Sequence, residues 1–344
     1  MSVPKVGILS DDRLQQHHIK NTLVQFGFDV LLVSEPSKIK ETSDTLCAWI
    51  VDYPCDDDNL SWLDDLLDGT VPVLMGIEKA PQKTHPTFPK WERKLHNKLH
   101  EFTQGLVRQR SRPSIEPLEH LEQQSTPTGA RIPLPLALRN REFSQQVASH
   151  VWMLGASLGG PEAVKIFLDA LPKGLPIGFI YAQHIDPRFE KVLCKSIGRH
   201  SEYRFKNFQE NQPIYCGEVL VAPIEHEFVF DYQRLPHSLG TAWPGPYGPS
   251  ISQMITNTDQ GYATQAGYIL FSGMGNDGAQ AISALKNSVP IWAQSPESCA
   301  NASMPESAIA TGKVSFIGDP YQLALQLVNW IKHQWIPNHE PITH

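Results

Sequence analysis

The sequence predicts an α/β protein with two doubly wound domains, each built on a parallel sheet. Short apolar runs alternate with segments whose apolar residues recur at helical spacing, and this alternation is typical of parallel sheets covered by helices on both faces. It occurs twice, in residues 1–105 and 148–337, and a proline-rich and polar linker at 106–147 separates the two stretches. A length of 344 residues suits two domains with a linker and a short tail at 338–344.

Composition and charge exclude several classes of protein. A hydrophobic content of 41% is ample for two cores, and a net charge of −7 argues against nucleic-acid binding and against docking on an anionic membrane. The five cysteines form no C-x-x-C pair, so neither disulfides nor a zinc site is predicted. No signal peptide and no apolar run of about 18 residues is apparent. We therefore expect a cytoplasmic protein without membrane insertion and without a nucleic-acid partner.

The first domain alternates strands and helices from its start. Strands are predicted at 5–9, 30–33, 48–51 and 71–75, and helices at 14–26, 36–43, 60–67 and 91–104. Asp11 and Asp12 follow the first strand, and Asp52 follows the third. Because the carboxyl ends of parallel strands share an edge, these three carboxylates are placed to converge on one magnesium ion.

This arrangement resembles the response-regulator receiver domain. The resemblance makes Asp52 a candidate phosphoacceptor and makes Asp11 and Asp12 candidate magnesium ligands. It fails after the fourth strand, where the family has a serine or threonine and this chain has Gly76-Ile77-Glu78. The family's Lys-Pro at the end of a fifth strand is matched only by Phe88-Pro89-Lys90, in reverse order. We therefore predict a degenerate receiver-like domain that is not controlled through phosphorylated Asp52.

The second domain repeats the alternating pattern. Strands are predicted at 151–154, 177–182, 268–271 and 290–293, with a short strand pair in 214–223. Helices are predicted at 163–171, 188–198, 279–286 and after Asp319. Residues 232–249 are predicted to form an irregular loop. Three of these strands end in residues capable of chemistry, namely Ser157, His184 and Asp277. Residues at such positions gather in one crevice of an open parallel sheet, so we expect these three side chains to lie together.

Ser157 lies in a glycine-flanked turn between a strand and a helix. The sequence Gly-Ala-Ser-Leu-Gly at 155–159 has the spacing of a nucleophile elbow. A glycine-rich turn of this kind binds a phosphate or only makes a tight corner about as often as it carries a nucleophile. Serine needs a base to remove its proton, and the imidazole of His184 is suited to that role. An aspartate such as Asp277 orients the imidazole. The order Ser, His, Asp differs from that of the α/β-hydrolases.

Two other classes of function stay open from the residues alone. One is a nucleotide-binding domain, because 273–278 fits Gly-x-Gly-x-x-Gly between a strand and a helix. The acidic Asp277 beside a pyrophosphate and the absence of a ribose-binding acid weaken it. The other is a non-catalytic docking module whose triad is a relic.

The motifs of the second domain, in order, resemble the catalytic domain of the CheB-type protein-glutamate methylesterases of bacterial chemosensory systems. They are the segments 155–161, 183–184, 221–226, 249–251, 272–279, 293–294 and 304–305. The resemblance implies a Ser157–His184–Asp277 triad and an oxyanion hole made by the backbone N–H groups of Leu158 and Met274. It implies demethylation of glutamate methyl esters on methyl-accepting chemoreceptors, allows glutamine deamidation, requires no cofactor, and suggests a sensor histidine kinase or adaptor as a further partner.

The chain also departs from that family at three places. Leu158 stands where threonine is usual, Ser295-Pro296 replaces Asp-Glu, and Glu306 replaces a basic residue. These departures indicate a divergent branch, such as one that serves a pilus-type chemosensory system. They bear on the choice of substrate more than on the chemistry.

Overall fold

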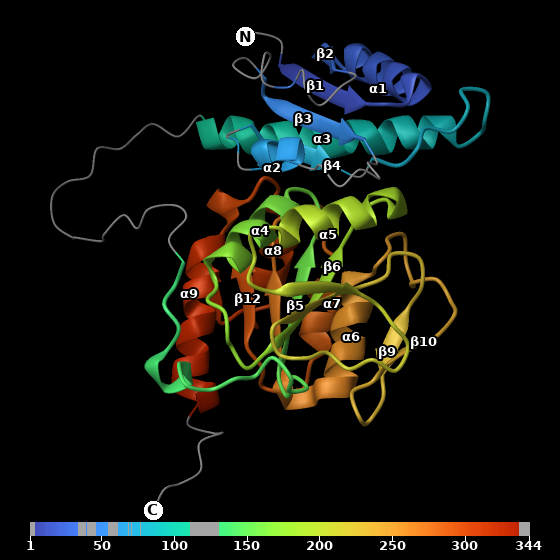
Figure 1. The fold of residues 1–344 in the computed structure, drawn as a ribbon. Helices are drawn as coiled ribbons and strands as arrows, with labels where there is room; N and C mark the ends of the chain where they lie inside the picture. Colours follow the sequence, from blue (N-terminus) through green and yellow to red (C-terminus); the bar gives the residue numbers. More distant parts are fainter. Residues whose placement is uncertain are drawn as a thin grey trace, which may run out of the picture.

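The computed structural model describes residues 4–33, 39, 46–53, 61–67, 69, 71–75, 77–110 and 131–336. The helix predicted at 36–43 lies almost entirely outside this part of the chain, as does the linker between residues 111 and 130. Figure 1 shows the N-terminal domain above the larger second domain.

The N-terminal domain contains a four-stranded parallel sheet in the order β2-β1-β3-β4. Its elements are β1 (Lys5–Ser10), α1 (Arg13–Gln25), β2 (Asp29–Val33), β3 (Ala48–Asp52), α2 (Ser61–Leu67), β4 (Val73–Met75) and α3 (Phe88–Arg110). The strands and the three described helices fall where the sequence predicts them. Helix α3 continues past residue 105, the predicted end of the domain, and runs across the N-terminal domain above the second domain (Figure 1).

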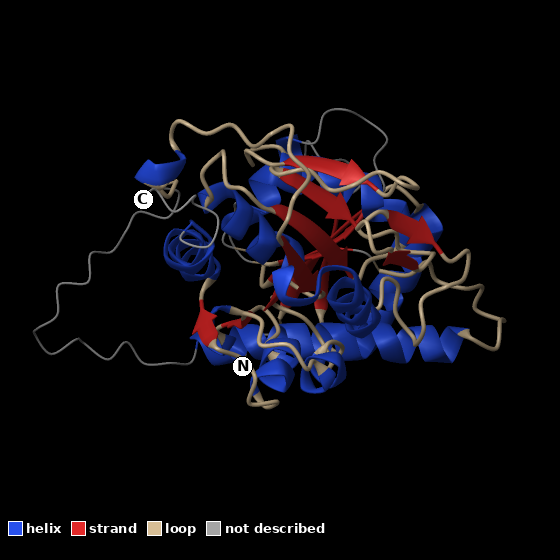
Figure 2. Ribbon diagram, turned by 90° about the horizontal axis from the view of Figure 1, so that it is seen from below, coloured by secondary structure: helices blue, strands red, loops and turns tan. Residues whose placement is uncertain are grey.

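The second domain contains a seven-stranded parallel sheet in the order β13-β12-β11-β5-β6-β8-β7. The strands are β5 (Val151–Ala156), β6 (Gly178–Gln183), β7 (Arg204–Asn207), β8 (Glu218–Val221), β11 (Ala266–Leu270), β12 (Ile291–Gln294) and β13 (Phe316–Gly318). The helices are α4 (Gly160–Ala170), α5 (Glu190–Gly198), α6 (Ile251–Tyr262), α7 (Ala279–Ala284), α8 (Ser303–Ile309) and α9 (Pro320–Trp330). Figure 2 shows helices packed around the stacked strands, so the predicted doubly wound class is confirmed.

Strand β5 marks the point where the direction of winding changes. The chain passes from β5 to β6 on one side, and β11 pairs with β5 on the other. All residues of β5, β6 and β11 are buried. In sheets of this kind, the crevice beside such a switch point is where ligands bind. The loops after these three strands carry Ser157, His184 and Asp277.

Several short elements were not predicted. They are β7, β13, α6, α8 and an antiparallel hairpin formed by β9 (Phe228–Phe230) and β10 (Pro236–Ser238), which lies within or beside the predicted loop at 232–249. The strand pair predicted at 214–223 is instead one strand, β8, with a single bridge between Val147 and Tyr215. The strands among them and α8 are too short to show a period and are defined by the elements against which they pack. The 12-residue α6 does carry a helical period, since Ile251, Met254, Ile255 and Thr258 are buried, but it was missed.

The end of the linker packs on the second domain. Ile132, Leu138 and Phe143 are all buried, so residues after 130 belong to its core although proline and polar residues dominate the sequence there. At the other end of the domain, Asp319 and Gln322 form the reciprocal cap that starts α9, as the sequence predicts. No helix of the described chain is both long and apolar enough to cross a bilayer.

Candidate active site

Ser157 lies on a turn that only glycine allows. Strand β5 ends at Ala156, and α4 begins at Gly160. Gly159 has φ of +74°, and a Cβ there would lie 2.4 Å from the Cβ of Ala300. The side-chain amide of Gln183 donates to the Ser157 carbonyl at 2.8 Å and holds the turn from the neighbouring strand. The predicted strand–turn–helix junction around Ser157 is confirmed.

His184 and Asp277 form a hydrogen-bonded pair. The distance from His184 Nε2 to Asp277 Oδ2 is 3.0 Å, and the two side chains are 7% and 15% exposed. Asp277 also accepts the backbone N–H groups of Ile251 and Ser252, each at 2.8 Å, at the start of α6. Burial alone would raise the pKa of Asp277, but the hydrogen bonds from His184 and Ser252 outweigh it and lower the pKa to about 2. The carboxylate is therefore ionised at neutral pH.

Ser157 and His184 line one cavity of about 220 Å³. No hydrogen bond joins the two side chains within the described part of the chain, and a serine and its base are often apart before substrate is bound. Because Nε2 faces Asp277, Nδ1 is the ring nitrogen left to take the serine proton. The structure thus places the three predicted residues at one edge of the sheet.

The candidate oxyanion donors lie beside the serine. Leu158 and Ser157 line one small cavity together with Met274. Neither the Leu158 nor the Met274 backbone N–H donates to another residue of the described chain. Two N–H groups at this place are able to bind a developing oxyanion.

The glycine-rich motif at 273–278 does not offer a phosphate cradle. The Gly273 N–H donates to the Asn301 carbonyl at 3.0 Å, that of Gly275 to Ser303 Oγ at 2.9 Å, and that of Gly278 to Ser252 Oγ at 2.7 Å. A pyrophosphate would need such N–H groups to be free. The motif serves instead to place Asp277, and the nucleotide-binding alternative loses its support.

A family model described as CheB methylesterase matches residues 152–327, just over half of the 344-residue chain. The chain belongs to the CheB methylesterase family. "Protein-glutamate methylesterase/protein-glutamine glutaminase 3" of Geobacter sulfurreducens is 30% identical over 168 residues, which are 48% of this chain and 45% of that protein. The protein of the same name numbered 6 from Anaeromyxobacter dehalogenans is 29% identical over 228 residues, 64% of this chain and 65% of its own length.

Among solved structures, the crystal structure of the Thermotoga maritima CheB methylesterase catalytic domain matches with a TM-score of 0.49 and 22% identity. The match covers 52% of this chain and 97% of that one. This chain spans 45% and 65% of the two curated relatives named above, so the activity of the whole protein is treated below as a proposal.

In this CheB-family chain, the N-terminal domain forms part of the wall of the active-site cavity. Glu78, Lys94 and Lys98 of that domain line it together with His184 and Ser157. Withdrawal from water lowers the pKa of Lys98. An α-helix, about 10 Å wide with its side chains, is too large for a cavity of this size.

Leu158, the departure from the family's threonine, joins the core of the N-terminal domain. Its side chain is 6% exposed and belongs to one apolar cluster with Leu74, Trp91, Leu95 and Leu99. Met274 packs on the same cluster. The residue next to the nucleophile therefore links the two domains, a role that its position in the motif did not reveal.

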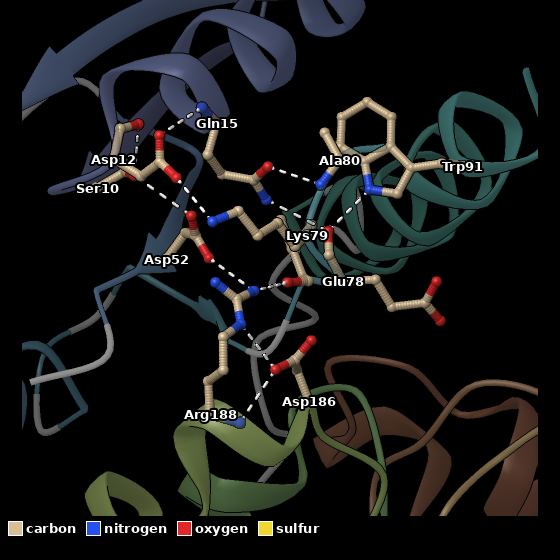
Figure 3. A network of polar contacts seen from close by, with 11 residues as sticks. Ser10, Asp12, Gln15, Asp52, Glu78, Lys79, Ala80, Trp91, Asp186 and Arg188 are labelled. Atoms are coloured by element: carbon tan, nitrogen blue, oxygen red, sulfur yellow. Dashed lines mark hydrogen bonds and ion pairs between the residues drawn. The ribbon is translucent and has the colours of Figure 1, made fainter. Parts of the chain in front are cut away.

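Arg188 makes a second link between the domains (Figure 3). It follows His184 in the loop after β6, and its Nη2 lies 3.4 Å from Asp52 Oδ1 and donates to the Ile77 carbonyl at 3.0 Å. Its Nε donates to Asp186 at 2.9 Å. Burial raises the pKa of Asp52 to about 6 against the opposing effect of Arg188. Sequence reasoning missed Arg188, because nothing in the chain order pairs it with Asp52.

Two of the three acidic residues predicted to bind magnesium make other contacts in the structure. Asp12 caps α1 by accepting the Leu14 N–H at 2.9 Å and also pairs with Lys79 at 3.2 Å, while Asp11 points to the exposed surface. Within the described ranges, no three acidic, histidine or cysteine side chains gather to hold a metal. Lys79 and Arg188 thus pair with two of the three carboxylates, and whether Asp11, Asp12 and Asp52 bind a magnesium ion stays a prediction. Whether Asp52 accepts a phosphoryl group stays a prediction.

Proposed function

We propose that this chain hydrolyses methyl esters of glutamate side chains on methyl-accepting chemoreceptors and also deamidates glutamine there. The observation that carries the proposal is the Asp277–His184 pair beside Ser157 in one cavity. The names of the relatives, which describe both a methylesterase and a glutaminase, support the two reactions. A cytoplasmic location, a sensor histidine kinase or adaptor as a further partner, and service to a pilus-type system belong to the proposal as predictions from the sequence.

The reaction proceeds in two halves. Ser157 Oγ attacks the ester carbonyl while its proton passes to His184 Nδ1, and the oxyanion is bound by the N–H groups of Leu158 and Met274. The C–O bond to methanol then breaks, and His184 returns the proton to the leaving group. Water attacks the acyl-enzyme with His184 again as base and releases glutamate. With glutamine the leaving group is ammonia, and the second half is unchanged.

The test is methanol release from a methylated chemoreceptor incubated with the full chain. We expect release above that from the receptor alone and retention of the new carboxylates on the receptor. Stable binding of the receptor without any methanol release would instead favour the docking module with a relic triad.

We further propose that the N-terminal domain covers the active site and must move before a receptor reaches Ser157. The apolar contact of Leu158 and the polar contact of Arg188 support it. Control of this movement does not run through phosphorylated Asp52 in our proposal, since the hydroxyl residue expected near Gly76 is missing from the sequence.

Replacing Leu158 by threonine should weaken the cover. Burial of a leucine side chain contributes about 2 kcal/mol, and most of it is lost in the variant, while the Leu158 backbone N–H is kept. We expect methanol release to rise by roughly tenfold at receptor concentrations well below saturation, because saturating receptor would itself displace the cover. Leu325→Thr on α9, where the side chain is 41% exposed, is the matched control and should leave the rate unchanged. An unchanged or lower rate in Leu158→Thr would show that this leucine does not hold the cover.

Replacing Arg188 by glutamine should have a similar effect for a different reason. Asp52, which is 1% exposed, would lose its cationic partner, and hydrogen bonds to charged groups contribute about 1.5–3 kcal/mol. We expect roughly a tenfold rise in methanol release, with Arg139→Gln, at an exposed site, as control. In a double-mutant cycle, Asp52→Asn should add little to Arg188→Gln. Additive effects of the two changes would mean that the residues act separately.

A further inference from the structure

An aromatic side chain outside the triad lies flat against the imidazole of His184. The rings of Tyr247 and His184 are stacked, with centroids 4.7 Å apart and an interplanar angle of 21°. Tyr247 also lines the cavity that contains Ser157. The hydrogen bond from Nε2 to Asp277 fixes one edge of the imidazole but leaves the ring able to tilt about that bond. A flat contact on the ring face removes this freedom.

The loop that carries Tyr247 is anchored on both sides of it. The Trp243 ring is 6% exposed, and its indole N–H donates to the Pro223 carbonyl at 2.8 Å. At Gly248 the backbone packs so closely that a Cβ would lie 2.2 Å from the Ile224 carbonyl oxygen. Trp243 and Gly248 therefore fix the loop on either side of Tyr247 by packing against Pro223 and Ile224, the residues that follow β8. This anchoring helps to hold the Tyr247 ring over His184.

The same segment continues directly to Asp277. Ser250 caps α6, and the N–H groups of Ile251 and Ser252 bind the two oxygens of the Asp277 carboxylate. Residues 247–252 therefore contact the face of His184 at one end and hold its aspartate at the other. A single stretch of chain sets both the tilt of the imidazole and the direction of its hydrogen bond.

We propose that Tyr247 is a positioning residue for His184 in the hydrolysis proposed above, on which this inference rests. Its ring keeps the imidazole plane aligned so that Nδ1 faces Ser157. Its π face also stabilises the imidazolium that forms each time His184 takes a proton. The phenol hydroxyl has no part in this role. Sequence reasoning did not identify Tyr247, because residues 232–249 are predicted to be an irregular loop.

The test compares three variants of the full chain by methanol release. Tyr247→Leu should lower kcat about tenfold and leave KM within about twofold, because stacked aromatic pairs contribute an amount equivalent to between about twofold and tenfold in rate. Tyr247→Phe keeps the ring and should stay within about twofold of the wild type. Tyr232→Leu is the matched control, since Tyr232 is 90% exposed in the neighbouring hairpin, and it should change nothing. Thermal unfolding of each variant checks folding, and Tyr247→Gln replaces Tyr247→Leu if that variant is unfolded.

A second measurement tests the role of Tyr247 independently of whether the proposed substrate is correct. A small fluorophosphonate forms a bond between phosphorus and Ser157 Oγ with loss of fluoride, and it needs the same base but no receptor. Tyr247→Leu should be labelled about tenfold more slowly than the wild type, and Tyr247→Phe at the wild-type rate. If the wild type is labelled but releases no methanol, the proposed substrate is wrong while the labelling rates still decide the role of Tyr247. Equal rates for Tyr247→Leu and the wild type, or an equal loss in Tyr247→Phe, would overturn the positioning role.

Discussion

Replacing Ser157 by alanine is expected to abolish methanol release. Ser157 is the hydroxyl on the turn after β5, and it faces the cavity that His184 and Tyr247 also line. Loss of the serine in a comparable triad costs about 10⁶-fold in turnover, so the rate should fall below detection. The change removes one oxygen that holds no hydrogen bond to another described residue, and the free energy of unfolding should stay within about 0.5 kcal/mol.

The matched control for this change is Ser144→Ala. Ser144 is exposed and bonds only to Glu142 at the end of the linker, so its removal should leave the rate at the wild-type value. Mass spectrometry after fluorophosphonate treatment should show one added group in the wild type and none in Ser157→Ala. Turnover near the wild-type value in Ser157→Ala would remove this serine from the mechanism.

Replacing Asp277 by asparagine is expected to lower turnover by roughly 10⁴-fold. Both carboxylate oxygens accept hydrogen bonds, from His184, Ile251 and Ser252. An amide has only one acceptor oxygen, so its NH₂ group would face one of these donors or turn the imidazole to the wrong tautomer. The lowered pKa of Asp277 corresponds to about 2 kcal/mol of stability at neutral pH, and this contribution is also lost in the variant.

Asp277 also makes the stability of the folded chain depend on pH, with a definite sign. Because the pKa of Asp277 is depressed in the folded chain, its contribution to stability is present at neutral pH and declines as the pH falls from about 4 towards 2. Asp277→Asn should show a smaller loss of stability than the wild type over that interval. Asp259→Asn is the control and should keep wild-type turnover, because Asp259 lies further along α6 and accepts a hydrogen bond from Asn287. A loss in Asp277→Asn of less than tenfold would mean that another acid orients His184.

The sequence alone was sufficient for the fold class and for the juxtaposition of Ser157, His184 and Asp277. Apolar strands and amphipathic helices alternate through both halves of the chain, and that order allows few topologies besides a doubly wound sheet. In such a sheet the residues after neighbouring strands must meet at one edge. Ser157, His184 and Asp277 could therefore be brought together before any coordinate was known, and their chemistry follows from their residue types.

Only the tertiary structure decided the contacts between segments that lie far apart in the chain. Asp277 is ionised and oriented by the start of α6, a helix that was not predicted, and Tyr247 reaches His184 from a loop without periodic pattern. Leu158 and Arg188 join the catalytic edge to the N-terminal domain. Local sequence patterns report the conformation of their own segment. Burial, partner and charge depend on which surfaces pack together, and that packing also pairs Asp52 with Arg188 of the second domain.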